Sequence, residues 1–144
     1  MENKLETITT EELYANEILQ LNDWHIISMN CILDEDTIEE FKNQVNWYFI
    51  SNCQRLSEKF IMKHKYDVHW SGIFQNQILS EYFIEIIMKD CDKLLWENIS
   101  KYQILSEEFI EKHSKDVIWN FIRKYQNLSI EFRIKYEDIL GDKI

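Results

Sequence analysis

Residues 104–126, ILSEEFIEKHSKDVIWNFIRKYQ, are one full copy of a motif that recurs along the chain. Tryptophans set its register, because successive tryptophans are separated by 23, 23, 26 and 23 residues. An isoleucine follows each tryptophan by three positions and a leucine by nine. These columns stay in step across five units, so we interpret the chain as a tandem repeat of about 23 residues. The five tryptophans are Trp24, Trp47, Trp70, Trp96 and Trp119.

Each copy reads as two short helices, which we name the A helix and the B helix. In the A helix the apolar positions fall at 0, 4, 5 and 8 residues from the leucine, which is helical periodicity. The B helix has its tryptophan and isoleucine on one stripe, and we expect it to start near Asp67 or Asp116. A helices are expected to open after capping residues, which are Asp34, Ser57, Ser80, Ser106 and Ser129.

Neither helix is long enough to be stable alone, so each must bury its apolar stripe against its neighbours. The sequence therefore predicts an all-α, solenoid-like stack of about five short helix pairs with atypical terminal capping helices. We expect one domain over residues 1–144, with an N-terminal capping helix in 1–23 and tandem repeats in 24–140. The 26-residue interval predicts an A helix after Leu79 that is almost one turn longer than the others.

Composition narrows the class of protein. The 144 residues include 16 Lys and Arg against 26 Asp and Glu, and the net charge of −10 disfavours binding to nucleic acid or to anionic membranes. The chain has no proline and two glycines, which favours helix. No apolar run is long enough for a membrane span, and the N-terminus does not read as a signal peptide. Three cysteines without a CxxC motif are typical of reduced thiols in the cytoplasm.

Three phrases, LSEKFIMKH, ILSEEFIEKHSKDVIWNFIRKYQ and VNWYFISNCQ, resemble short tandem helical repeats in uncharacterised proteins of large DNA viruses and phages. The resemblance spans roughly Trp24 to Leu140 and includes no established catalytic residues. It implies a viral or phage origin, a host-cell location and a role in interaction. The 23 N-terminal residues and the unit with the longer interval depart from the pattern.

We find no catalytic, metal-binding or cofactor-binding motif. Two glycines cannot supply a phosphate-binding loop, and no Cys/His cluster has zinc spacing. Cys91 lies between Asp90 and Asp92, whose negative charge disfavours the thiolate that a nucleophile requires. His64 and His113 share one repeat position with apolar and aromatic residues, so we interpret that position as a packing site. Its other occupants are Phe41, Ile87 and Tyr136.

Two further columns are interpreted as structural. The tryptophan rings are expected in the core. A small residue four positions after the tryptophan, as in Ser28, Ser51 and Ser100, lets a neighbouring helix come close. Seven positions after the tryptophan, a glutamine is expected to tie the backbone of one unit to the next, because buried amides need partners. The glutamines are Gln54, Gln77, Gln103 and Gln126.

Acidic residues form two columns on the A helices, opposite the apolar stripe, and we expect both columns to face solvent. Like charges four residues apart cost about 0.2–0.5 kcal/mol per pair. The first column is Glu35, Glu58, Glu81 and Glu107, and the second is Glu39, Glu85 and Glu111. Two interpretations remain open: a solvated surface that maintains solubility, or a docking surface for a basic protein partner.

The sequence favours a non-enzymatic protein-binding repeat protein over an enzyme. Together with the resemblance, the acidic columns lead to the hypothesis of a viral or phage inhibitor of a host-defence protein. Such an inhibitor would occupy the basic nucleic-acid groove of a nuclease. The alternative is a structural or self-assembling protein whose uncapped stacking faces join end to end.

Overall fold

A computed structural model describes residues 7–8 and 24–141 of the chain. The chain divides into two compact units, residues 1–76 and 77–144, and each is described by itself below. The described residues form short helices in a stacked, repeat-like order and one pair of two-residue strands, so the fold is all-α. No helix in this part of the chain has the length and apolar composition needed to cross a membrane.

In the first unit, B helices alternate with A helices along the chain. Its B helices are α2 (Trp24–Asn30), α4 (Trp47–Cys53) and α6 (Trp70–Asn76), and its A helices are α3 (Glu35–Glu40) and α5 (Glu58–Lys63). The strands β1 (Thr7–Ile8) and β2 (Ile32–Leu33) pair in parallel. Apart from β1, the segment in which we expect the N-terminal capping helix lies outside the described residues.

The second unit continues the same alternation. Its A helices are α7 (Glu81–Met88), α9 (Glu107–Lys112) and α11 (Ile130–Lys135), its B helices are α8 (Leu95–Tyr102) and α10 (Trp119–Tyr125), and α12 (Glu137–Leu140) ends it. The A helix α7 has eight residues, whereas α9 and α11 have six. The A helix expected to be longer from the 26-residue interval is therefore longer, but by about half a turn rather than almost one.

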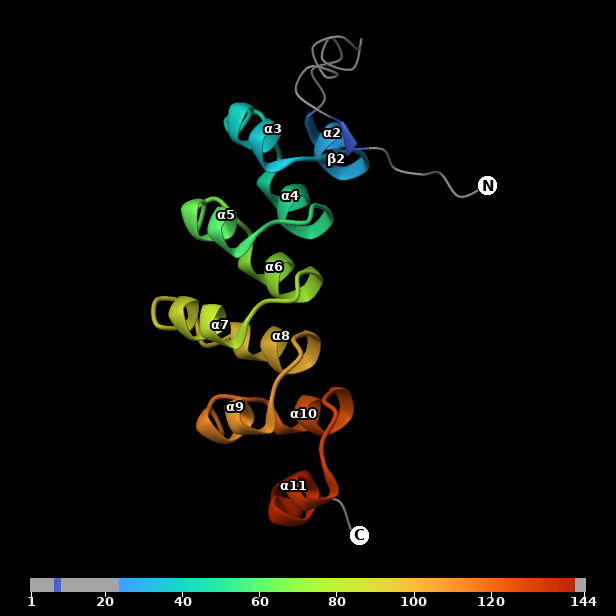
Figure 1. Ribbon diagram of the computed structural model, residues 1–144, viewed down its shortest axis with the longest axis vertical. Coiled ribbons are helices and arrows are strands. Elements are labelled where there is room, and N and C mark those ends of the chain that lie inside the picture. The colour runs from blue at the N-terminus through green and yellow to red at the C-terminus, as the bar shows by residue number, and fades with distance from the viewer. Residues whose placement is uncertain (1–6, 9–23, 142–144) are drawn as a thin grey trace, which may run out of the picture. The chain divides into compact units, whose positions relative to one another are not determined.

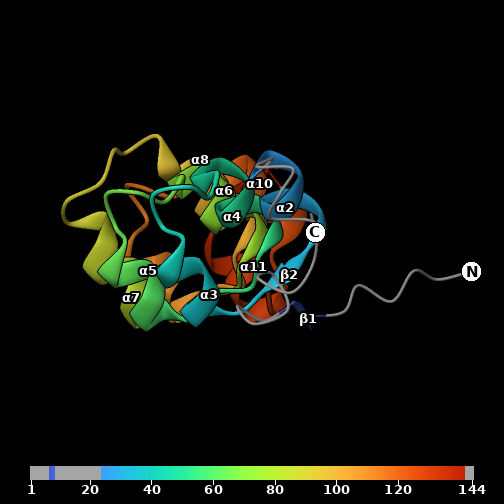
Figure 2. The same cartoon turned by 90° about the horizontal axis from the view of Figure 1, so that it is seen from above.

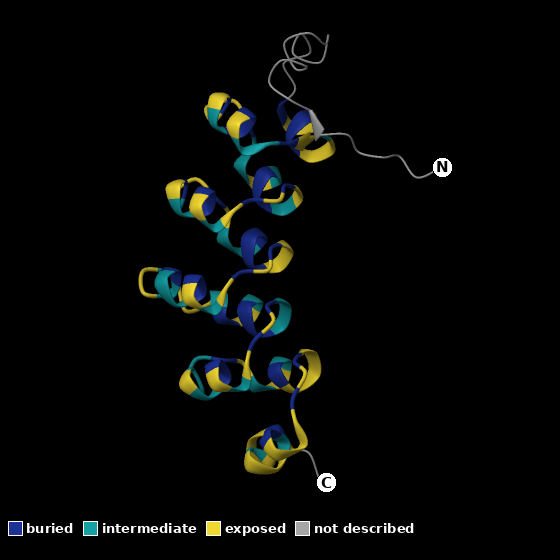
Figure 3. Cartoon of the chain, viewed as in Figure 1, coloured by how far each residue is buried: buried dark blue, intermediate teal, exposed yellow. Residues whose placement is uncertain are grey.

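Within each unit the B helices form one column and the A helices another, as the two views show for α2, α4 and α6 beside α3 and α5 (Figures 1 and 2). The B helices contact one another directly, α2 with α4, α4 with α6 and α8 with α10. Buried residues gather between the columns (Figure 3). The isoleucines three positions after each tryptophan are almost fully buried, as are those five after each leucine in α3, α5, α7 and α9.

The capping residues predict the starts of the A helices correctly. Ser106 Oγ, for example, accepts a hydrogen bond from the backbone N–H of Phe109, and the other predicted caps bond in the same way. The predicted starts of the B helices are wrong. Asp67 and Asp116 lie in turns, and the helices begin three residues later at the tryptophan. The reason is that the backbone N–H groups of Val68 and Val117 still bond back to His64 and His113, and the first helical hydrogen bonds are accepted by His69 and Ile118.

The expectation that the tryptophan rings lie in the core is confirmed for two of the five. Trp24 and Trp96 are buried, whereas Trp47, Trp70 and Trp119 are half-buried. Each of those three donates its indole N–H to a backbone carbonyl five residues earlier, at 3.0–3.1 Å. In four of the repeats a ring seventeen positions after the tryptophan packs on it, at centroid distances of 4.7–5.1 Å. Those packing residues are Phe41, His64, His113 and Tyr136, which confirms the histidine position as a packing site.

Candidate functional site

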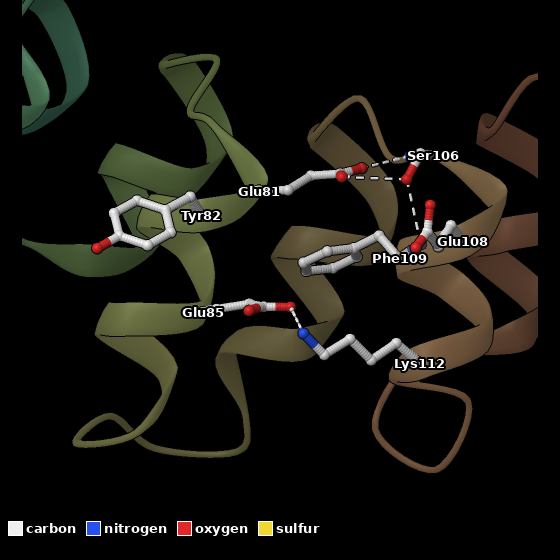
Figure 4. Close-up of a pocket in the computed structure, with 7 residues that line it drawn as sticks. All are labelled: Glu81, Tyr82, Glu85, Ser106, Glu108, Phe109 and Lys112. Atoms are coloured by element: carbon white, nitrogen blue, oxygen red, sulfur yellow. Dashed lines mark hydrogen bonds and ion pairs between the residues drawn. The ribbon is translucent and has the colours of Figure 1, made fainter.

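The first acidic column bridges consecutive A helices. Glu81 Oε1 accepts a hydrogen bond from the backbone N–H of Ser106 at 2.5 Å, and Glu81 Oε2 accepts one from Ser106 Oγ at 3.0 Å (Figure 4). In a capping box, the third helical residue returns a carboxylate to the capping N–H. That residue here is Phe109, so the preceding repeat supplies the carboxylate instead. The same two-bond contact joins Glu35 to Ser57 and Glu107 to Ser129.

The second acidic column is paired with cations of the following repeat. Glu39 lies 3.0 Å from Lys63 Nζ and 2.6 Å from His64 Nε2, and Lys42, in the turn after α3, lies 3.1 Å away. Hydrogen bonds from Lys63, His64 and Lys42 lower the pKa of Glu39 to about 2. At the equivalent position in the second unit, hydrogen bonds from Lys112 and His113 lower the pKa of Glu85.

Glu111 completes the second column, with Lys135 Nζ at 2.6 Å from its carboxylate. This hydrogen bond raises the pKa of Lys135. All seven glutamates of the two columns are therefore half-buried residues rather than a free ridge. We expected the columns to face solvent, and they do so only in part, because each carboxylate whose bonds are described above also reaches the next repeat. Glu58 occupies the same repeat position on α5 as Glu81 on α7 and is half-buried like it.

The glutamine column ties one repeat to the preceding one, as expected. Gln103 is buried, its Oε1 accepts the backbone N–H of Leu79 at 3.0 Å, and its Nε2 donates to the carbonyl of Gln77 at 2.6 Å. Gln54 and Gln126 make the same pair of contacts with Leu33 and Leu105 and with nearby carbonyls. The amide groups of these side chains therefore bind backbone groups of the neighbouring repeat and are not available to a ligand.

The serines of the B helices also join neighbours. Ser51 is fully buried, and its Oγ accepts the backbone N–H of His69, the residue before the next B helix, at 2.8 Å. Ser28 and Ser100 accept the equivalent N–H groups of Asn46 and Ile118 at 3.0 and 2.9 Å. A small residue at this position thus permits close contact of B helices. A helices lie farther apart, and their longer glutamates span the gap.

A groove of about 290 Å³ lies between α7 and α9, where the A helices separate. Glu81, Tyr82 and Glu85 line one side and Ser106, Glu108, Phe109 and Lys112 the other (Figure 4). Glu81 and Glu85 are engaged by Ser106 and Lys112, whereas the ring of Tyr82 is 75% exposed. The groove therefore contains an exposed tyrosine ring beside two carboxylates, those of Glu81 and Glu85, that already have partners.

A second candidate surface is formed by the B helices of the first unit. Their sequences, WHIISMN, WYFISNC and WSGIFQN, contain no Asp, Glu, Lys or Arg, although 29% of the chain is charged. We name the outward side of α2, α4 and α6 the uncharged face. Its exposed or half-exposed residues include His25, Met29, Tyr48, Phe49, Asn52, Cys53, Gln75 and Asn76.

Side chains on the uncharged face contact one another across repeats. The rings of His25 and Phe49 are 5.7 Å apart, those of Tyr48 and Phe49 are 5.4 Å apart, and those of Tyr48 and His69 are 5.2 Å apart. Asn52 Oδ1 accepts a hydrogen bond from Asn76 Nδ2 at 3.2 Å. These contacts make a continuous row of rings and amides over three B helices, held in place by neighbours rather than by charge.

The corresponding helices of the second unit differ. There α8 and α10 contain Glu97, Lys101, Arg123 and Lys124. Lys101 Nζ lies over the rings of Tyr102, Phe121 and Tyr125 at 4.8–5.8 Å. The absence of charge is therefore not a requirement of the B helix itself, because the same repeat positions accept Glu and Lys elsewhere in the chain.

The acidic charge is also distributed unevenly. Residues 1–23 contain six Asp or Glu and one Lys, so this segment accounts for half of the net charge of −10. The sequence pattern led us to expect an acidic surface on the A-helix columns, and neither this segment nor the uncharged face was predicted. Each signal was present in the amino-acid sequence as a local count of charged residues.

The described residues show no arrangement that points to catalysis. Residues 7–8 and 24–141 contain no group of three or more His, Cys, Asp or Glu side chains able to hold a metal ion. Cys31, Cys53 and Cys91 form no disulfide, and burial raises the pKa of the Cys31 thiol, which disfavours its thiolate. No protein-family model, curated protein or solved structure matches this chain.

Proposed function

We propose that this chain is a non-enzymatic protein-binding repeat protein, and that the uncharged face of α2, α4 and α6 is its contact surface. The observation that supports this proposal is the complete lack of charged residues in three consecutive B helices. A surface helix of a soluble protein ordinarily has charged residues on its solvent side. Repeat proteins bind partners through the same positions of successive units, which are the positions left uncharged here.

Composition favours a protein partner for this face. Cores of protein–protein interfaces are depleted in charged residues and enriched in aromatic residues and methionine. Tyr48 is 54% exposed and Met29 is 44% exposed, and the half-buried ring of Phe49 lies beside Tyr48. Such rings lose little conformational entropy on binding and often dominate the affinity of an interface. The amides of Asn52 and Asn76 add donors and acceptors without adding charge.

The partner chemistry follows from the same composition. A face without charges gains nothing from a strongly basic or acidic partner, so the matching surface is apolar and aromatic with neutral hydrogen-bonding groups. Binding through it is expected to persist in 1 M salt, where screening acts within about 3 Å.

The test uses substitutions that the repeat already tolerates. Tyr48→Glu introduces the residue that α8 has at this position, Glu97, and Met29→Lys introduces the residue that α8 and α10 have, Lys101 and Lys124. We expect both variants to fold, as judged by circular dichroism and thermal unfolding, and to lose partners captured from lysate by the native chain.

The matched control is Asn120→Glu, which places a charge at the Tyr48 position of α10 in the second unit. This variant is expected to capture the same partners as the native chain. Full capture by Tyr48→Glu and Met29→Lys would exclude the uncharged face as the contact surface.

A second candidate is a charge-driven interaction in which the acidic columns and the α7–α9 groove dock on a basic protein. The exposed Tyr82 and the exposed Glu108, which line opposite sides of this groove, favour it, because arginine side chains stack on tyrosine and pair with carboxylates. Loss of the partner in 1 M salt, and its loss on Glu108→Lys, would support this version. A viral or phage inhibitor of a host-defence nuclease is the narrower form of this proposal.

A further inference from the structure

In α3, α7 and α9, one side of the A helix contacts the A helix of the following repeat. The A helix α11 differs in sequence from the others on this side. Two positions after the leucine, where α3, α5, α7 and α9 have glutamate, α11 has Ile130. Four positions later, where α3, α7 and α9 have glutamate, it has Ile134. In α3 and α7 these two positions hold the A helix of the following repeat through Ser and Lys or His. In α11 both carboxylates are replaced by aliphatic side chains.

These aliphatic side chains are exposed. Ile130 is 68% exposed and Ile134 is 55% exposed, and they lie one helical turn apart on the same side of α11. Ile139, on the adjoining helix α12, is 53% exposed. The opposite side of α11 is buried, as in the other A helices: Phe132 is 4% exposed. The α11 face, defined by Ile130 and Ile134, is thus an apolar version of a surface that elsewhere joins two A helices.

We propose that the α11 face binds the α11 face of a second copy of this chain. The position-matched surfaces of α3, α7 and α9 contact another A helix, so the geometry of this side suits helix-to-helix contact. This side of α11 lacks the acceptors of the usual contact, since neither isoleucine can accept the hydrogen bonds that a capping serine donates to Glu35 or Glu81. An aliphatic stripe is complemented by another aliphatic stripe, and a second copy presents an identical one.

The distribution of charge also favours the α11 face as the contact between two copies of the chain. Two copies with a net charge of −10 each repel one another over most approaches. Of the A helices in the described part of the chain, α11 alone has no carboxylate in either acidic column, so two copies meet less repulsion through this side of α11 than through the same side of another A helix. Two identical patches in contact form a two-fold, closed dimer rather than a filament. The small area makes it a weak dimer, because stable dimers bury about 1,200–2,000 Å² or more.

The test is sedimentation equilibrium of the full chain over a wide range of protein concentration. We expect the average mass to rise from 17.7 kDa toward twice that value as concentration increases. Ile130→Glu and Ile134→Glu restore the residues that other repeats have at these positions, so both variants are expected to fold and to remain monomeric. Ile104→Glu is the matched control: Ile104 is 71% exposed but lies in a loop, and this variant is expected to dimerise like the native chain.

Three results would overturn the proposal. They are a native chain that stays monomeric at every concentration, a dimer that survives Ile130→Glu and Ile134→Glu together, and a dimer that is abolished by Tyr48→Glu instead. The last result would place self-association on the uncharged face, so it separates this proposal from the one for partner binding. Circular dichroism of each variant ensures that loss of the dimer is not loss of the fold.

Discussion

Glu81 and Ser106 form a two-bond contact in which one repeat completes the helix cap of the next: both carboxylate oxygens accept from Ser106, at its backbone N–H and its Oγ. The Ser106 hydroxyl in turn accepts a hydrogen bond from the backbone N–H of Phe109. One serine therefore caps its own helix and also binds the previous repeat. A position that looks like a surface charge in an isolated helix is therefore part of the contact between repeats.

This contact predicts energetic coupling between the two residues. Ser106→Ala should lower the free energy of unfolding by about 1 kcal/mol, the usual effect of losing an N-cap side chain. Glu81→Ala should cost about 1 kcal/mol because two hydrogen bonds are lost at a partly exposed site. The double variant should lose less than the sum, by about 0.5 kcal/mol or more. Urea unfolding measures all three; strictly additive losses would show that the contact does not stabilise the fold.

Gln103 is expected to be the more sensitive position. Gln103→Leu keeps the size of the side chain but leaves the N–H of Leu79 and the carbonyl of Gln77 without this partner in a buried site. We expect a loss of about 3 kcal/mol in the free energy of unfolding. The control is Gln75→Leu at an exposed position of α6, which should change it by less than about 0.5 kcal/mol. Similar effects of the two substitutions would refute the structural role of the glutamine column.

Glu39 predicts a dependence of stability on acid. Its pKa is lowered to about 2 in the folded chain by Lys63, His64 and Lys42. A lowered carboxyl pKa stabilises the fold at every pH above the ordinary value of about 4.3. That contribution is lost as the pH falls from about 4.3 through about 2, because the unfolded chain binds the proton first.

Glu39→Gln removes this contribution, so its free energy of unfolding should fall less steeply with acid than that of the native chain in the same window. The comparison is made by urea unfolding at several pH values. Glu108→Gln, at an exposed position of α9, is the control and should follow the native pH dependence. If Glu39→Gln also follows it, the ion pairs of Glu39 do not stabilise the fold.

Substitutions at His64 test whether its ring stabilises the fold by packing or by ion pairing. It is 5% exposed and packs on Trp47 at 4.8 Å, as Phe41 packs on Trp24 at 4.7 Å. His64→Phe should therefore change the free energy of unfolding by no more than about 1.5 kcal/mol at neutral pH. His64→Ala should cost about 3 kcal/mol, because a buried ring is lost and a cavity remains. Equal losses for the two variants in thermal unfolding would contradict the packing interpretation.

The starts of the A helices and the role of the glutamine column were predictable from sequence because the residue type alone indicates a helix cap or a buried amide. Ser57 and Ser106 cap their helices as expected, and Gln103 bonds the neighbouring backbone as expected. Both inferences rest on local rules: a serine before an acidic helix start, and a buried amide that needs partners. The expected start of the B helix at Asp67 failed because a capping residue can also sit in a turn, where Asp67 contacts His64.

The role of the acidic columns was not predictable in the same way. Helical periodicity places Glu81 opposite the apolar stripe of its own helix, but it does not say how far the next A helix lies from it. That distance is set by the B helices, whose buried serines bring their backbones together and leave a gap between A helices that glutamates span. The uncharged face, by contrast, is readable from sequence once charged residues are counted helix by helix.

Consecutive repeats are joined through the glutamine column, and this contact is central to the stacked fold. Hydrogen exchange of the backbone amides of Leu79 and Leu105 measures this directly, because both lie outside helices and both donate to a glutamine Oε1. We predict that these amides exchange as slowly as amides in the middle of the helices, and that Gln103→Leu accelerates Leu79. Exchange of both at the rate of an unprotected loop in the native chain would contradict the account.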